Sequence, residues 1–174
     1  MEIRRPGPDV VDALLGFFGR IPAAERTFFK ESVLDRATVA SWTGGARGLA
    51  CERGEIAGYV AVVPLGGWSD HVGELRLVVA PEWRRQGVGR RLARWALLQA
   101  IELGLRKVYV EVVADQEGAV AMFLELGFQA EGVLADHVRD RDGTLRDLVL
   151  LAHPIADQWA AMASAGIDDA LGNG

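Results

Sequence analysis

The chain has 174 residues, of which 50% are hydrophobic and 25% charged, and its formal net charge is −5. That composition is typical of a globular protein with a sizeable core and excludes a disordered chain. The single cysteine, Cys51, excludes an internal disulfide framework and predicts a reducing, cytoplasmic location. No apolar run approaches the roughly 18 residues of a membrane span, and the proline, glycine and acidic residues near the start argue against a signal peptide.

Positive charge is concentrated in one segment. Residues 81–107 have a net charge of +5, so the remainder of the chain sums to −10. Affinity for a nucleic-acid backbone needs a broad positive face, and we therefore expect no nucleic-acid partner. A compact positive segment suits a small anion with a few phosphates.

The first half of the chain predicts a strand, helices and a hairpin. A short strand over 2–5 is stopped by Pro6-Gly7-Pro8. Apolar residues recur at helical spacing over 9–21, where Asp9 is a candidate N-cap, and a further helical segment is expected within 23–43. Residues 47–65 predict a hairpin, because two apolar runs flank a polar Glu-Arg-Gly-Glu turn.

The second half alternates strands with helices. A nearly continuous apolar strand over 73–80, as expected for one covered on both faces, leads to a helix over 88–103 that Gly104 ends. A strand over 107–114 and a helix over 117–126 follow. Two last strands, 128–138 and 145–153, flank a turn at 141–143, and a helical tail is expected over 155–171. The order predicts a mixed α/β sheet with a central parallel pair joined by a right-handed crossover.

The turn between the apolar strand and its helix is a candidate anion site. The stretch VVAPEWRRQGVGRRLARW, residues 78–95, directs the unpaired N–H groups of a helix start at one point. Gly87 and Gly89 let a phosphate approach the backbone, because they have no Cβ. A Walker A loop is excluded because no Lys-Ser or Lys-Thr pair follows, and Leu92 stands where a dinucleotide fingerprint has its third glycine.

Two motifs together resemble a known family. The R-x-x-G-x-G pattern at 84–89, preceded by LVVAPEW, resembles the pyrophosphate loop of the GNAT superfamily of acyl-CoA-dependent N-acyltransferases. The stretch VYVEVVADQEGAVAMFLELGF resembles the next strand and helix of that superfamily, with matches at Glu111, Ala119, Gly127 and Phe128. The resemblance covers roughly residues 55–153, and its parts occur in the right order and spacing.

The resemblance implies a fold and a domain organisation. The fold class is α/β (α+β), a mixed and mostly antiparallel central sheet with a splayed parallel strand pair and flanking helices. Residues 1–153 would form a single acetyltransferase domain and residues 154–174 a C-terminal helical tail. The tail is either a packed terminal helix or a contact in a homodimer.

The resemblance also implies acetyl-CoA as co-substrate and a set of residues that bind it. Leu77, Val78 and Val79 would line the pantetheine arm. Gln116 replaces the usual asparagine and would bond the pantetheine amide or a water. The pyrophosphate would lie on the backbone of the loop, while Arg84, Arg90 and Arg91 either add charge or face water. The loop residues are Arg85, Gln86, Gly87, Val88, Gly89 and Arg90.

Two carboxylates are candidate general bases. Glu111 aligns with the base of the ribosomal-protein alanine N-acetyltransferase branch, and a dry cleft would raise its pKa. The alternative is that Glu111 faces solvent or pairs with an arginine. Glu74 matches a base position of other GNAT branches, or it is a strand-edge surface residue.

The usual tyrosine acid is absent. Phe123 stands at its position beside the cofactor and donates no proton, which should slow the reaction rather than abolish it. Tyr59 and Tyr109, the chain's two tyrosines, are substitutes for it or structural strand residues.

The acceptor side is less defined. Phe28, Phe29 and Trp42, together with His137, Arg139 and Asp140, are candidates to shape it, and residues 66–71 are a further candidate border. A minority interpretation makes His137 a base. The three histidines, His71, His137 and His153, are too scattered for a metal site, and no metal is expected.

The sequence therefore predicts an acetyl-CoA-dependent N-acetyltransferase that works by direct attack in a ternary complex. The acceptor is a primary amine of a small molecule or of a peptide or protein. Two alternatives stay open: a weakly active or inactive module that binds acyl-CoA, and a transferase for a longer acyl-CoA.

Overall fold

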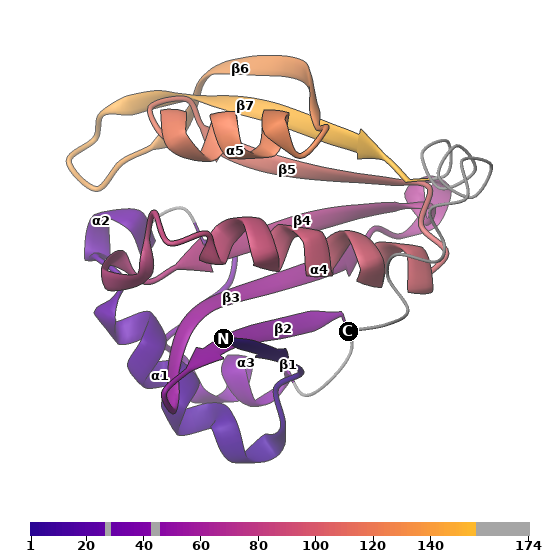
Figure 1. Ribbon diagram of the computed structural model, residues 1–174. Coiled ribbons are helices and arrows are strands. Elements are labelled where there is room, and N and C mark those ends of the chain that lie inside the picture. Colours follow the sequence, from indigo (N-terminus) through magenta and orange to yellow (C-terminus); the bar gives the residue numbers. More distant parts are fainter. Residues whose placement is uncertain (27–28, 43–45, 156–174) are drawn as a thin grey trace.

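The computed structural model describes residues 1–26, 29–42 and 46–155, and in these ranges the strands form one sheet in the order β1-β2-β3-β4-β5-β7-β6 (Figure 1). Only β4 and β5 are parallel, and every other neighbouring pair is antiparallel. The predicted mixed, mostly antiparallel class is therefore confirmed. The strands are β1 (Glu2–Arg4), β2 (Arg47–Glu52), β3 (Glu55–Pro64), β4 (Val72–Val79), β5 (Lys107–Val113), β6 (Gln129–Arg139) and β7 (Leu145–Pro154).

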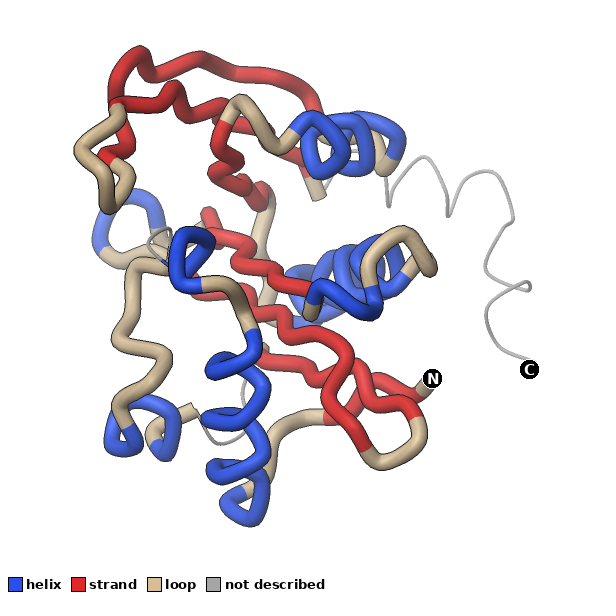
Figure 2. The backbone as a smooth tube through the Cα atoms, turned by 90° about the vertical axis from the view of Figure 1, so that its left-hand side faces the viewer, coloured by secondary structure: helices blue, strands red, loops and turns tan. Residues whose placement is uncertain are grey.

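Helices cover both faces of the sheet (Figure 2). α1 (Val11–Arg20) and α3 (Arg36–Ala40) lie on one face, where Leu14, Phe17 and Phe18 pack with Trp42 and Tyr59. α4 (Val88–Glu102) and α5 (Glu117–Glu125) lie on the other face. The remaining helical turns are α2 (Ala23–Arg26) and the 3₁₀ turns η1 (Pro8–Val10), η2 (Gly67–Ser69) and η3 (Pro81–Trp83).

The N-terminal helices differ in detail from the sequence expectation. Asp9 lies inside η1 and caps no helix, because the backbone turns already at Gly7 and α1 begins at Val11. The segment 23–43 contains two short helices, α2 and α3, rather than one longer helix. Asp35 caps α3, since its side chain accepts a hydrogen bond from the Thr38 N–H at 2.8 Å.

The later helix ends agree with the glycines in the sequence. Gly104 has a φ of +71° just after α4, and the Leu105 N–H donates to the Ala100 carbonyl. Gly127 ends α5 in the same way, with the Phe128 N–H bonded to the Phe123 carbonyl. Most of the predicted helical tail, residues 156–174, lies outside the described residues, so the division at 153 stays a prediction. Within the described ranges no helix has the length and hydropathy to cross a membrane.

Two small residues let α4 approach the sheet closely. A Cβ on Gly58 of β3 would lie 2.7 Å from Leu92 Cδ1 and 3.0 Å from the Val78 carbonyl oxygen. A Cβ on Gly48 of β2 would lie 2.8 Å from the Trp95 ring. Because a side chain at either position would push α4 away, these glycines fix the helix over β2–β4. This contact sets the N-terminus of α4 beside the end of β4.

Candidate active site

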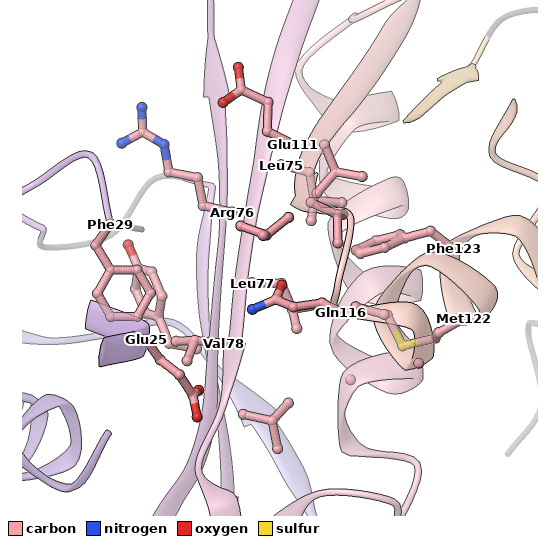
Figure 3. A pocket seen from close by; sticks show the side chains of 18 of the residues that line it. Glu25, Phe29, Leu75, Arg76, Leu77, Val78, Glu111, Gln116, Met122 and Phe123 are labelled. Carbon is pink, nitrogen blue, oxygen red and sulfur yellow. The ribbon is translucent and has the colours of Figure 1, made fainter. Parts of the chain in front are cut away.

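The parallel strands β4 and β5 separate and open a cavity. They pair only where Val72–Glu74 meets Lys107–Tyr109. Beyond that point β4 stays with β3 as far as Val79, and β5 stays with β7 as far as Val113. A cavity of about 1170 Å³ lies in the resulting gap, between the helix starts of α4 and α5 and the loop after α2 (Figure 3). The edge of β4 from Leu75 to Val79 thus has no strand partner on the cavity side among the described residues.

The N-terminus of α4 lies at one end of this cavity. Gly87 has a φ of +78° and precedes the helix, whose hydrogen bonds begin with the Arg91 N–H donating to the Gly87 carbonyl at 3.1 Å. The N–H groups of Val88, Gly89 and Arg90 therefore have no partner within the helix. Together with the helix dipole they form a site for an anion.

The arginines around this loop bind to the protein itself. The Arg84 guanidinium donates to the Val79 carbonyl at 3.1 Å and to both carboxylate oxygens of Glu25 in α2. Arg90 pairs with Glu125, and Arg91 donates to the Met1 carbonyl at 3.0 Å. The side chains of Arg84, Arg90 and Arg91 are thus engaged within the protein, whereas the backbone N–H groups at the helix start have no partner within the helix.

Two apolar walls flank the cavity (Figure 3). On the β4 side, Leu77 and Val79 pack against the core under α4, and Val78 packs against the core under α1. On the α5 side, Gln116, Met122 and Phe123 line the space. Gly89 allows α4 and α5 to meet here, because a Cβ on it would lie 3.1 Å from the Met122 sulfur.

The two predicted bases meet at a lysine. Glu74 ends the paired part of β4, and Glu111 lies on β5 just past the point of separation. Lys30, in the loop between α2 and α3, places its Nζ 2.9 Å from Glu74 Oε1 and 2.9 Å from Glu111 Oε2. Glu111 therefore forms an ion pair, as one alternative predicted, but its partner is this lysine and not an arginine.

Glu74 is the more firmly held of the two carboxylates. Its side chain is 8% exposed, against 25% for Glu111. Burial raises the pKa of Glu74, but the hydrogen bonds from Arg76 and Lys30 outweigh burial and hold that pKa below its usual value. Burial likewise lowers the pKa of Lys30, but the two carboxylates reverse this and leave the pKa raised. Both groups are therefore charged near neutral pH.

A second set of charges continues from Glu74 toward α3. Arg76 bonds Glu74 at 2.9 Å and Glu31 at 3.1 Å. Arg47 donates to the Tyr59 hydroxyl at 2.7 Å, and its guanidinium lies 5.1 Å from the centre of the Trp42 ring. Burial is the main cause that raises the pKa of Tyr59 to about 12. Tyr59 is thus a neutral residue of the cavity lining, on β3, whereas Phe123 lies on α5.

The other predicted residues are divided between the cavity and its surroundings. Phe29, Trp42, His137 and Arg139 line the cavity, whereas Tyr109 does not. Asp140 accepts a hydrogen bond from Arg146 instead. Phe28 lies outside the described residues.

Gln86 and residues 66–71 lie outside the cavity lining. The side chain of Gln86 turns back to the Glu82 carbonyl, at 2.9 Å, and does not line the cavity. Residues 66–71 form the turn at the far end of β4, away from Val79, and contribute nothing to the lining. The turn between β3 and β4 therefore does not border the cleft as expected.

Sequence reasoning missed the cations of the site. Lys30 and Arg76 were not singled out, and neither were Glu31, which pairs with Arg76, and Glu25, which pairs with Arg84, although all of them line the cavity. One signal was present: Lys30 is one of only two lysines among 19 basic residues. Within the described part of the chain, no group of three or more metal-ligating side chains exists.

Glu74 should stabilise the fold in a pH-dependent way. A carboxylate whose pKa is lowered on folding stabilises the protein above its usual pKa of 4.5, and that stabilisation is lost as the pH falls below it. We expect Glu74→Gln to reduce the free energy of unfolding by about 1–3 kcal/mol at pH 7 and by much less at acidic pH. Urea unfolding at several pH values measures this. Glu131→Gln is the control, because Glu131 forms an exposed ion pair with Lys107. An equal loss of unfolding free energy at every pH for Glu74→Gln would contradict the prediction.

Comparison with known proteins agrees with this architecture. The sequence profile of the acetyltransferase (GNAT) family matches residues 16–128. Ribosomal protein bS18-alanine N-acetyltransferase of Escherichia coli is 29% identical over 80 residues, which are 46% of this chain and 53% of that protein. Spermidine N(1)-acetyltransferase of Escherichia coli is 33% identical over 85 residues, 47% of this chain and 44% of that protein. The matched part spans about half the length of these curated relatives.

A solved structure shares the fold over nearly the whole described chain. The yncA protein of Salmonella typhimurium, determined with its cofactor acetyl-CoA, is 17% identical, with a TM-score of 0.79 over 90% of this chain and 95% of that one. The predicted resemblance to GNAT proteins, including the ribosomal-protein alanine branch, is confirmed. Since the family profile matches more than half of its residues, the chain belongs to the acetyltransferase (GNAT) family.

Proposed function

We propose that this chain is an N-acetyltransferase that transfers the acetyl group of acetyl-CoA to a primary amine, by direct attack in a ternary complex. The observation that supports this most is a single cavity with a helix start at one end and two carboxylates around an ammonium group at the other. Such a cavity suits a phosphorylated acyl donor and a cationic amine acceptor together.

The lining fits coenzyme A in three respects. The free N–H groups of Val88, Gly89 and Arg90 suit a pyrophosphate. The edge of β4 from Leu77 to Val79, which has no strand partner on the cavity side among the described residues, offers backbone groups to the amides of a pantetheine arm. The volume exceeds the range of about 300–1,000 Å³ of ordinary small-molecule pockets. The Salmonella typhimurium neighbour with acetyl-CoA supports the same donor.

The protein's own groups then have distinct tasks. Acetyl-CoA supplies a thioester whose carbonyl carbon accepts the amine. Glu111 Oε2 takes the proton that the acceptor ammonium must lose, since a protonated amine is no nucleophile. Glu74, held by Arg76, keeps a negative charge beside the acceptor and attracts it. Phe123 and Met122 keep the α5 wall apolar and exclude water.

The acceptor is a primary amine of a small molecule or of a peptide or protein. One relative is named for a ribosomal-protein alanine and another for spermidine, and each supports one of these classes. A module that binds acyl-CoA without transfer is the second candidate. It is favoured by Phe123, which leaves the position of the usual acid without a hydroxyl.

An amine panel with detection of the free CoA thiol tests the proposal. The panel contains spermidine, small monoamines, free amino acids and peptides with alanine at the N-terminus. Release of CoA that depends on one of these amines supports the transferase. Acetyl-CoA should also raise the melting temperature, because a ligand of the native state stabilises it. Binding without CoA release from any amine favours the passive module, and no binding of any acyl-CoA excludes both.

Phe123→Tyr should accelerate the reaction. Phe123 is 3% exposed and lines the cavity, so a hydroxyl at its ring edge adds a proton donor on the α5 wall. We expect kcat to rise about tenfold, less than the usual 10²–10⁴-fold contribution of a general acid, because a thiol leaves easily near neutral pH. Initial rates with the best amine measure it. Phe128→Tyr, the neighbouring ring at 5.0 Å outside the cavity lining, is the control for a buried hydroxyl. An unchanged kcat at position 123 would mean that the acid role is filled elsewhere.

A further inference from the structure

The ammonium of Lys30 occupies the place between Glu74 and Glu111 that we propose for the amine of the acceptor. Its Nζ is shared by Glu74 and Glu111 at 2.9 Å each, and these are the two carboxylates proposed to hold and deprotonate the acceptor. Lys30 lines the same cavity as the β4 edge and the start of α4. A primary amine of the chain itself is therefore in contact with the proposed base.

The remaining amines of the chain lie elsewhere. Lys107, the other lysine, begins β5 and pairs with Glu131 at 2.6 Å, and the N-terminal ammonium pairs with Glu52. Neither lines the cavity between β4 and β5. The side chains of Lys30 and Lys107 are similarly exposed, at 44% and 37%. The two lysines thus differ mainly in whether the proposed catalytic groups surround them.

Lys30 also has the freedom to move. It lies in the loop between α2 and α3, outside both helices. Its ammonium is held by two ion pairs rather than by burial, and nearly half of the side chain is in contact with solvent. A lysine side chain with such exposure can shift along the cavity through its own rotamers once its ion pairs with Glu74 and Glu111 open.

We propose that Lys30 is a site of self-acetylation, modified by the chain's own acetyl-CoA when no external amine fills the cavity. The inference rests on the proposed function. Glu111 takes the proton from the Lys30 ammonium, and the freed Nζ attacks the carbonyl carbon of the thioester. The N–C bond forms as the C–S bond breaks, and CoA leaves as a thiolate that takes up the second proton, which Nζ loses as the amide forms. The product is an uncharged acetyl-lysine, so Glu74 and Glu111 then face one cation fewer.

The test is a peptide map of the intact protein after incubation with acetyl-CoA and no added amine. A protease that cuts at acidic residues avoids any dependence on free lysine. We expect acetylation of Lys30 about tenfold or more ahead of Lys107 and Met1, because its amine is held beside the base. The rate per molecule should not depend on protein concentration. Equal acetylation of both lysines, no acetylation of Lys30, or a rate that rises with concentration overturns the proposal.

Matched variants separate catalysis from simple exposure. Glu111→Gln should remove the preference for Lys30, whereas Glu131→Gln, which removes the partner of Lys107, should leave it intact. Unfolding in urea should equalise the two lysines. Acetyl-CoA binding is measured in parallel by thermal shift, and CoA release with the amine panel. These two measurements distinguish failure of this inference from failure of the proposed function. If both are positive while Lys30 stays unmodified, this inference fails and the proposed function stands. If acetyl-CoA does not bind, both fail.

Discussion

Replacing Glu111 by glutamine is expected to reduce kcat/KM for the amine by about 10²–10⁴-fold, the usual contribution of a general base. The substitution keeps the shape of the side chain and removes its ability to accept a proton from the acceptor. It should have little effect on stability, because Glu111 makes one ion pair, with the half-exposed Lys30.

Glu74 should behave differently from Glu111. Two cations hold Glu74, and its pKa is lowered despite burial, so it is a weak proton acceptor. Glu111 is more exposed and is freed once Lys30 gives way to an acceptor. We therefore expect Glu74→Gln to raise KM and to lower the melting temperature, with a smaller loss of kcat than Glu111→Gln.

Rates against pH distinguish these roles. Glu111→Gln, which removes the proposed base, should change the pH profile of kcat/KM more than Glu74→Gln does. Glu131→Gln on β6 is the matched control and should leave rate and profile unchanged. A greater loss of kcat for Glu74→Gln than for Glu111→Gln would reverse the assignment of the base.

Much of the fold follows from local sequence features. Gly104 and Gly127 adopt the positive φ values that end α4 and α5, as their places after apolar helical runs predict. The apolar strand over 73–80 is confirmed as β4, flanked by strands and covered by helices on both faces. The β6 strand was predicted, but its two register irregularities, near Ala130 and Leu134, were not, since they depend on pairing with β7.

In the candidate site, too, the features that are local in sequence were predictable and the contacts between distant residues were not. The start of α4 was predictable, because a strand, a turn with two glycines and a helix are consecutive in sequence. The ion pairs of Lys30 were not, because they join a loop to strands 44 and 81 positions later, and no periodicity marks such a contact. The partners of the arginines were not predictable either, since Arg84 and Arg90 bind Glu25 and Glu125, which lie far from them in sequence.

Replacing Gly89 by aspartate should weaken the binding of acetyl-CoA strongly while keeping the fold. Gly89 is the second residue of α4, where an acidic side chain is favourable to the helix dipole. The added Cβ would meet the flexible Met122 side chain at 3.1 Å, a contact that a small shift relieves. The carboxylate, however, would lie among the N–H groups that a pyrophosphate needs. Loss of one to two charge-assisted hydrogen bonds, about 1.5–3 kcal/mol, weakens Kd by about ten- to a hundredfold.

Gly89→Asn separates charge from size in this experiment, because asparagine has the shape of aspartate without its charge. Calorimetric titration with acetyl-CoA and with CoA should give a much weaker Kd for the aspartate variant than for the asparagine variant. The difference should shrink as salt is raised, since ions screen repulsion between the carboxylate and the phosphates. Equal losses for the two variants would assign the effect to the Cβ and its contact with Met122. Unchanged binding in both would remove the start of α4 from the donor site, and the anion would then have to be sought along Arg84 and Arg85, whose side chains lie on the same cavity.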